Sequence, residues 1–173
     1  MLFRSVREAM LGQVRLQWWR EALDEVYAGK APRRHETVAP LAEAIRRRAL
    51  PRGPFDRLLL ARERDLDEAP ISTMVELETY ADGTSGELIG LALAVLGVDD
   101  PEVHERGRRI GRGYALTGIL RAVVFHARQR RCLLPSDILA RHGADADAVM
   151  TMTRSPAIAG AVAEIAEIGR AHV

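Results

Sequence analysis

The amino-acid sequence predicts an all-α protein, and three observations support this class. Apolar residues recur at steps of three to five along most of the 173-residue chain. No segment alternates apolar and polar residues with the period of two that marks a half-buried strand. Pro, Gly, Ser and Asp stand where one helical pattern ends and the next begins. With 47% hydrophobic residues, the chain is long enough to bury the core of one domain.

The first two predicted helices lie in the first 50 residues. Apolar spacing predicts a long helix over residues 3–27, which Gly29 ends. A basic loop follows, and a shorter apolar pattern predicts a helix over residues 38–50, closed by a Pro/Gly turn. Three arginines at residues 46–48 precede that turn and form no clustered recognition face. We therefore expect no binding of nucleic acid.

The third and fourth predicted helices carry different signals. Leucines and alternating charges over residues 55–68 predict a helix with one solvated face. Ser72 is placed to cap the next helix, which runs to residue 96. Gly83 and Gly86 interrupt its apolar period, and each costs about 1 kcal/mol relative to alanine in a regular helix. We therefore expect a kink there, or the close approach of another helix.

The last part of the chain predicts three further helices. Pro101 suits the first turn of a helix that continues into residues 110–135. Ser136 or Asp137 is expected to cap a short helix, and Ser155 to start a final helix that reaches residue 170.

Composition excludes several classes of function. The 25 basic and 24 acidic residues nearly cancel, so no global charge points to nucleic acid or to an acidic partner. The single cysteine, Cys132, excludes an internal disulfide and is interpreted as a buried apolar residue. No apolar run is long enough to span a bilayer, and no signal peptide is recognised. We expect a cytoplasmic protein, at most peripheral to the inner membrane.

The most specific pattern is residues 110–135, IGRGYALTGILRAVVFHARQRRCLLP. It resembles the second aspartate-rich helix of the squalene/phytoene synthase family, which reads close to LGxAxQLTNILRDVxEDxxxGRxYLP. The Trp-Trp segment QWWREAL and two central segments, RDLD and ELETYA, also match that family in order. The resemblance covers about residues 11–143. The family's acids and asparagine are replaced here by Ala122, Phe125, His126 and Gly118.

The resemblance implies an isoprenoid-synthase-like helical bundle. In this family about two more helices precede the Trp-Trp segment and help to close an apolar cavity. We therefore expect residues 1–173 to form a single partial domain, incomplete at the N-terminus, with apolar surface left uncovered.

The resemblance also implies the candidate site residues. In the family, carboxylates hold magnesium ions that draw off the pyrophosphate leaving group. Gly83 aligns with a second tyrosine of the central motif, and Ala122 and His126 with acids, so we expect no metal ligands. The remaining candidates for substrate binding are Tyr80, Asp65, Arg121 and Arg131. Salt bridges within the protein are the alternative role for Asp65 and the two arginines.

Within the family, the pattern is most similar to a catalytically degenerate branch that contains the mitochondrial complex I assembly factor 6. We therefore expect a non-catalytic protein without a cofactor, acting with respiratory-complex subunits or at the membrane periphery. One alternative is an active prenyl transferase that condenses two prenyl diphosphates with Mg²⁺. Another is a prenyl- or lipid-binding module whose pocket Trp18 and Trp19 would line.

Overall fold

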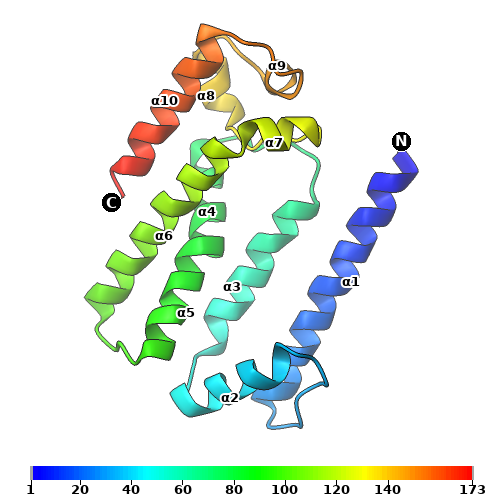
Figure 1. Cartoon of the computed structure of the whole chain (residues 1–173), viewed down its shortest axis with the longest axis vertical. Helices are drawn as coiled ribbons and strands as arrows, with labels where there is room; N and C mark the ends of the chain where they lie inside the picture. The colour runs from blue at the N-terminus through cyan, green and yellow to red at the C-terminus, as the bar shows by residue number, and fades with distance from the viewer. Residues whose placement is uncertain (1, 173) are drawn as a thin grey trace.

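The computed structural model describes residues 2–172, and over this range it is helical and contains no strand, as the sequence predicts (Figure 1). The α-helices are α1 (Leu2–Tyr27), α2 (Val38–Arg48), α3 (Arg52–Glu63), α4 (Met74–Ala81), α5 (Glu87–Leu96), α6 (Pro101–Arg121), α7 (Val123–Arg128), α8 (Ser136–Arg141), α9 (Ala146–Met150) and α10 (Pro156–Arg170). A 3-10 turn, η1 (Arg64–Leu66), extends α3, and a π-helical turn, η2 (Asp82–Gly86), joins α4 to α5.

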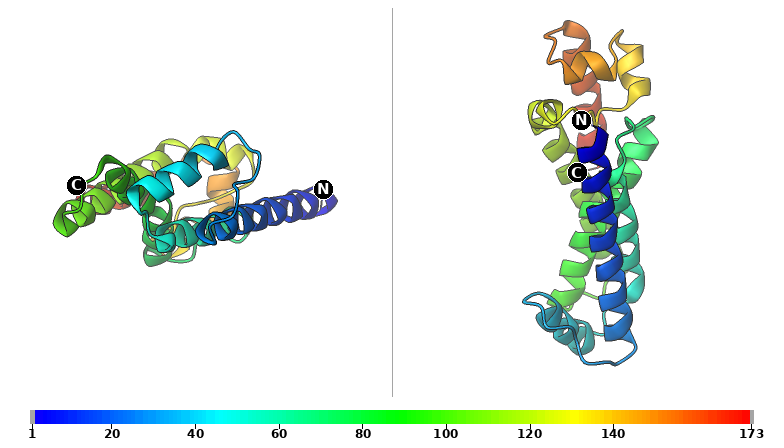
Figure 2. Two further views of the ribbon diagram at one scale, coloured as in Figure 1. Left: turned by 90° about the horizontal axis from the view of Figure 1, so that it is seen from below. Right: turned by 90° about the vertical axis from the view of Figure 1, so that its right-hand side faces the viewer.

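The long helices run side by side along the length of the molecule. α3 packs against α1 and α5, and α6 packs against α5 and α10. In Figure 1, α2 crosses one end of α1 and α3, and α7 lies at the opposite end of α6, with α8 and α9 beyond it. Figure 2 shows that the molecule is elongated along the direction of the long helices. No helix between residues 2 and 172 has the length and hydropathy needed to cross a bilayer.

Two clusters of buried side chains hold the helices together. One lies between α1, α2, α3 and α5, and includes Leu23, Ile45 and Phe55. The other lies between α4, α6 and the C-terminal helices, and includes Leu77 and Leu116. α4 contributes to the second cluster and α5 to the first. The bent helix formed by α4, η2 and α5 therefore connects the two halves of the molecule.

The prediction of a kink or close approach near Gly83 and Gly86 is confirmed. η2 is a π-helical turn, and a Cβ atom on Gly83 would lie 2.7 Å from the Cβ of Ala61 on α3. On the other side of η2, a Cβ on Gly111 of α6 would lie 2.6 Å from the carbonyl oxygen of Ser85. At η2, the bent helix therefore approaches both α3 and α6 more closely than any side chain larger than that of glycine would permit.

Several predicted helix ends need correction. Thr73, not Ser72, is the N-cap of α4, where its side chain accepts a hydrogen bond from the backbone N–H of Glu76. The expected cap of α8 is also misplaced, because Pro135 occupies the N-cap position, while Asp137 in the first turn accepts a hydrogen bond of 2.7 Å from the N–H of Ile138. Ser155 caps α10 as predicted.

Three helix boundaries also differ from the prediction. α2 ends at Arg48 because Ala49 adopts a left-handed conformation with φ of 49°. α3 tightens into η1 before residue 68, and the short helix α9 was not predicted. The helix that begins at Pro101 is interrupted at Ala122, where α7 begins in a new direction (Figure 1).

Candidate functional site

Four of the sequence-predicted site residues, Asp65, Tyr80, His126 and Arg131, lie near enough to act on one another through their charges. We call this group the polar cluster and define it as Arg62, Asp65, Tyr80, His126 and Arg131. The Tyr80 hydroxyl donates a hydrogen bond of 2.7 Å to Oδ1 of Asp65. Arg62 donates to Oδ2 of Asp65 at 3.1 Å and to the Tyr80 hydroxyl oxygen at 3.4 Å. Asp65 is therefore already engaged by two partners.

The local fold explains why these groups meet. Arg62 and Asp65 are three residues apart, and the 3-10 geometry of η1 keeps them on one side of the chain. Arg64 fixes the segment that follows, since it binds Oε1 of Glu76 at 2.9 Å and the carbonyl of Ala69 at 2.7 Å. This anchoring presents Asp65 to Tyr80 on α4.

The charges in the polar cluster act on both titratable rings. Burial, and then the hydrogen bond and charge of Asp65, raise the pKa of Tyr80 to about 12, against the opposing charges of Arg62 and Arg131. Burial, and then the charge of Arg131, lower the pKa of His126, while Asp65 raises it. These effects favour the neutral form of His126, whose buried Nδ1 atom has no hydrogen-bond partner within the described residues 2–172.

The space beneath α7 is closed. His126 and Arg131 border it together with Cys132 and Val149, and it is too small to admit water. Cys132 is buried, as predicted, and burial raises the pKa of its thiol. A thiol in this environment is a poor nucleophile.

The magnesium ions implied by the family resemblance do not fit the side chains present. Magnesium prefers carboxylate and other oxygen ligands, in near-octahedral geometry. Residues 2–172 contain no group of three or more His, Cys, Asp or Glu side chains placed to share a metal ion. The polar cluster holds one carboxylate, which two neighbours occupy, and two arginines. Its chemistry suits the binding of an anion better than the binding of a metal ion.

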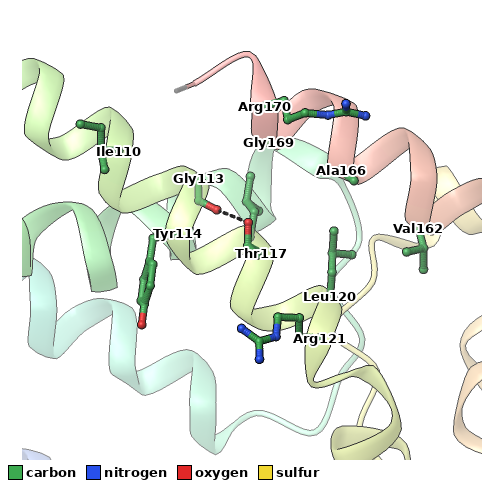
Figure 3. A pocket seen from close by; sticks show the side chains of 11 residues that line it. Ile110, Gly113, Tyr114, Thr117, Leu120, Arg121, Val162, Ala166, Gly169 and Arg170 are labelled. Atoms are coloured by element: carbon green, nitrogen blue, oxygen red, sulfur yellow. Dashed lines mark hydrogen bonds between the residues drawn. The ribbon is translucent and has the colours of Figure 1, made fainter.

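Arg121 lies apart from the polar cluster, on the rim of an open apolar groove of about 660 Å³ between α6 and α10. Figure 3 shows Arg121 and Tyr114 pointing to the side of α6 away from α10. The Thr117 hydroxyl is turned back to the carbonyl of Gly113, at 2.9 Å. The groove is lined by Ile110, Gly113, Tyr114, Leu116, Thr117, Leu120, Arg121, Val162, Ala166, Gly169 and Arg170.

The other predicted positions have structural roles or solvent exposure. Gly83 permits the contact between η2 and α3, which accounts for the loss of a tyrosine there. Ala122 forms the junction between α6 and α7. Phe125, at a former acid position, is 59% exposed. The rings of Trp18 and Trp19 pack at an angle against His35 in the loop after α1, and so belong to the packing of that loop.

Sequence reasoning missed an ionic network around η2. Glu87 is 2% exposed, and its carboxylate accepts hydrogen bonds from Arg57 at 2.6 and 3.0 Å. Arg108 on α6 lies 3.3 Å from Glu87 and also pairs with Asp82. The sequence signal that could have pointed to Glu87 is its place as an acid at the start of the apolar run ELIGLALAVL. The network joins α3, η2 and α6.

Comparisons with known proteins agree on one family. The family model described as Squalene/phytoene synthase matches residues 4–173. The chain is 31% identical to "NADH dehydrogenase (ubiquinone) complex I, assembly factor 6" of Mus musculus over 98% of this chain and 50% of that protein. Identity to the Homo sapiens protein of the same name is 28%, with the same coverage. The chain thus spans about half the length of these curated relatives.

Similarity also extends to enzymes of the family. The chain is 28% identical to presqualene diphosphate synthase of Rhodopseudomonas palustris, over 91% of this chain and 56% of that enzyme. Its fold matches the crystal structure of squalene synthase HpnC from Alicyclobacillus acidocaldarius with a TM-score of 0.82 and 22% identity, over 92% of this chain and 60% of that one.

Proposed function

The chain belongs to the squalene/phytoene synthase family, and from that premise we propose that it is a non-catalytic member that supports the assembly of respiratory complex I. Its partners would be subunits of that complex. One observation carries the proposal. The polar cluster and the helices α6 and α7 lack the set of carboxylates that the family resemblance implies as magnesium ligands.

Three substitutions support the loss of catalysis. Ala122, Phe125 and His126 offer no carboxylate oxygen at the positions where the family resemblance implies acids. A leaving pyrophosphate needs its charges neutralised, and several carboxylates are required to hold the metal ions that do this. Arg62 and Tyr80 meanwhile engage Asp65, the one carboxylate of the polar cluster. In this proposal the hydrogen bonds of the polar cluster hold the end of α3 and η1 against α4.

The relatives support the assembly role. The assembly factor 6 proteins of Mus musculus and Rattus norvegicus are 31% identical to this chain over 98% of its length. The matches therefore include both the α1–α5 half and the C-terminal helices. Shared fold alone would not indicate this role, because one scaffold hosts many functions.

An active prenyl transferase is the second candidate, and the similarity to presqualene diphosphate synthase favours it. Tyr80, Asp65, Arg121 and Arg131 would then contact prenyl diphosphate, with Mg²⁺ held by other acids. The arrangement of side chains argues against this candidate, because Arg121 lies on the groove rim rather than in the polar cluster.

Deletion of the gene, with rescue by the full natural chain, tests the proposal. We expect the deletion to lower the amount of assembled complex I on native gels, and the wild-type gene to restore it. The variant Asp65→Asn should also restore it, because assembly does not use the charge of Asp65 and the amide oxygen can still accept the hydrogen bond from Tyr80.

The same strains distinguish the second candidate. Unchanged complex I together with a loss of squalene- or phytoene-type products in the deletion would overturn the assembly role. Rescue of these products by the wild type but not by Asp65→Asn would favour a prenyl transferase.

A further inference from the structure

The inner face of α7 holds a ring nitrogen without a bonding partner. Nδ1 of His126 is buried, and no atom of residues 2–172 forms a hydrogen bond with it. The closed space beneath α7, bordered by His126, Arg131, Cys132 and Val149, has no room for a water molecule that could serve instead. Because side chains of this chain enclose the atom, it gains a partner only if α7 moves.

The charged groups around His126 disfavour a second positive charge there. Burial, and then the charge of Arg131 in the loop after α7, lower the pKa of His126. Asp65 on η1 raises it, but Tyr80 and Arg62 already bond to both oxygens of that carboxylate. The side chains that α6 and α9 contribute to the closed space are apolar. An imidazolium at this position would therefore meet an arginine and no free carboxylate.

The contacts that hold α7 in place are few. Ala127 is its one fully buried residue, and no side chain of the described residues caps its N-terminus. In the turn that follows, the N–H of Arg131 bonds to the carbonyl oxygen of His126 at 3.0 Å. Arg130 has a left-handed backbone there, with φ of 60°, a conformation that favours glycine. The charge on one enclosed ring can therefore decide whether this short helix stays in place.

We propose that α7 is a pH-sensitive element, in which uptake of a proton by His126 displaces the inner face of the helix and exposes Cys132. Displacement hydrates the imidazolium and separates it from Arg131. The proton comes from solvent and returns to it as the pH rises, so the change is reversible. It does not depend on the proposed function, and it rests on enclosed atoms rather than on exposed surface.

The direction of the pH dependence follows from proton binding. With α7 in place, His126 has a pKa below its ordinary value of 6.5, whereas a displaced, hydrated ring titrates near that value. Above pH 6.5 both forms are neutral, and the packed position carries no penalty. As the pH falls through 6.5, the displaced form takes up the proton first and becomes more populated, by up to about tenfold per pH unit.

Thiol labelling of Cys132 in the full natural chain tests the proposal, with mass spectrometry to locate the label. A dipyridyl disulfide is the probe because it reacts in acid. Rates are divided by those of the urea-unfolded chain at the same pH, which corrects for ionisation of the thiol. The corrected rate should rise as the pH falls from about 7 to about 5, by up to about tenfold per unit. His126→Gln should abolish this rise, and Arg131→Gln should reduce it.

The matched control is His104→Gln, which replaces a histidine near the other end of α6, where its ring bonds to the carbonyl of Val98. This variant should keep the wild-type pH dependence. A corrected rate that does not change with pH in the wild type, or an equal rise in His126→Gln, would overturn the proposal. Loss of helical circular dichroism over the same pH range would also contradict it, because the label would then report unfolding of the whole protein.

Discussion

At the scale of single residues, Asp65 keeps an acid at a position that the resemblance associates with substrate, yet its partners lie within the chain. Tyr80 and Arg62 use both of its oxygens. The negative charge of Asp65 is also one reason why the pKa of Tyr80 is high, after burial. The titration of Tyr80 should therefore depend on the charge of Asp65.

Replacing Asp65 with Asn should lower the pKa of Tyr80 from about 12. The amide keeps a hydrogen-bond acceptor but removes the charge that opposes ionisation of the phenol. Burial, the largest cause, is unchanged, so the pKa should remain above the ordinary value of 10.0. Titration of tyrosinate absorbance, with Tyr80→Phe to assign the step, provides the measurement. An identical high-pH step in both proteins would show that Asp65 does not act on Tyr80.

Glu87 is the second residue whose removal should matter. Glu87→Gln leaves Arg57 and Arg108 without their shared carboxylate, and the loss of a buried partner typically costs several kcal/mol. Because the Arg57 side chain is 54% exposed and can be rehydrated, we expect a decrease of about 2–3 kcal/mol in the free energy of unfolding.

The matched control is Glu102→Gln, which removes one exposed partner of Arg106. Both side chains of this pair are about 70% exposed, so its loss should cost less than about 1 kcal/mol. Urea unfolding compares the two variants. Equal destabilisation would mean that Glu87 contributes no more than a surface ion pair.

At the scale of elements, the close contact between α6 and η2 depends on Gly111. A Cβ atom there would lie 2.6 Å from the carbonyl oxygen of Ser85 and 2.9 Å from two backbone atoms of Gly86. Since backbone atoms cannot rotate aside, Gly111→Ala should force α6 away from η2 and cost about 1–3 kcal/mol.

Gly118, two turns further along α6, is the natural control. A Cβ atom there would meet no atom within 4 Å, so Gly118→Ala should stabilise the protein by about 0.5–1 kcal/mol through helix propensity alone. Thermal unfolding of the two variants should therefore shift in opposite directions. A stabilising effect of Gly111→Ala would contradict the packing described for η2.

The elements themselves were largely predictable from the sequence, because periodicity and glycines act locally. The kink at η2 followed from Gly83 and Gly86, and the start of α10 from Ser155. The N-cap of α4 was misplaced by one residue because Ser72 and Thr73 can both cap, and Thr73 is the one whose side chain reaches the N–H of Glu76. The helix α9 is too short to show an apolar period.

The site was less predictable, because its contacts join residues far apart in sequence. Asp65, Tyr80 and Arg131 were singled out by resemblance and do lie in the polar cluster. Arg62 was missed because alternating charges on α3 resemble a solvated face. Glu87 was missed because its partners, Arg57 and Arg108, lie on other helices. Arg121 was grouped with Arg131 by motif, but the break at Ala122 separates them.

At the scale of the whole molecule, the fold matches that of a squalene synthase, while residues 2–172 contain no group of three or more His, Cys, Asp or Glu side chains placed to share a metal ion. Packing explains how the fold can persist without metal-binding side chains. The core clusters and the network around η2 hold the helices without any contribution from a metal site. A scaffold stabilised in this way can lose its acids and remain folded.

The most direct test of the account is magnesium-dependent release of pyrophosphate from farnesyl and geranylgeranyl diphosphates by the full natural protein. We expect no release above a boiled control, with circular dichroism verifying that the assayed protein is folded. Clear magnesium-dependent turnover would contradict it, and would mean that acids outside the polar cluster and the α6–α7 helices hold the metal ions.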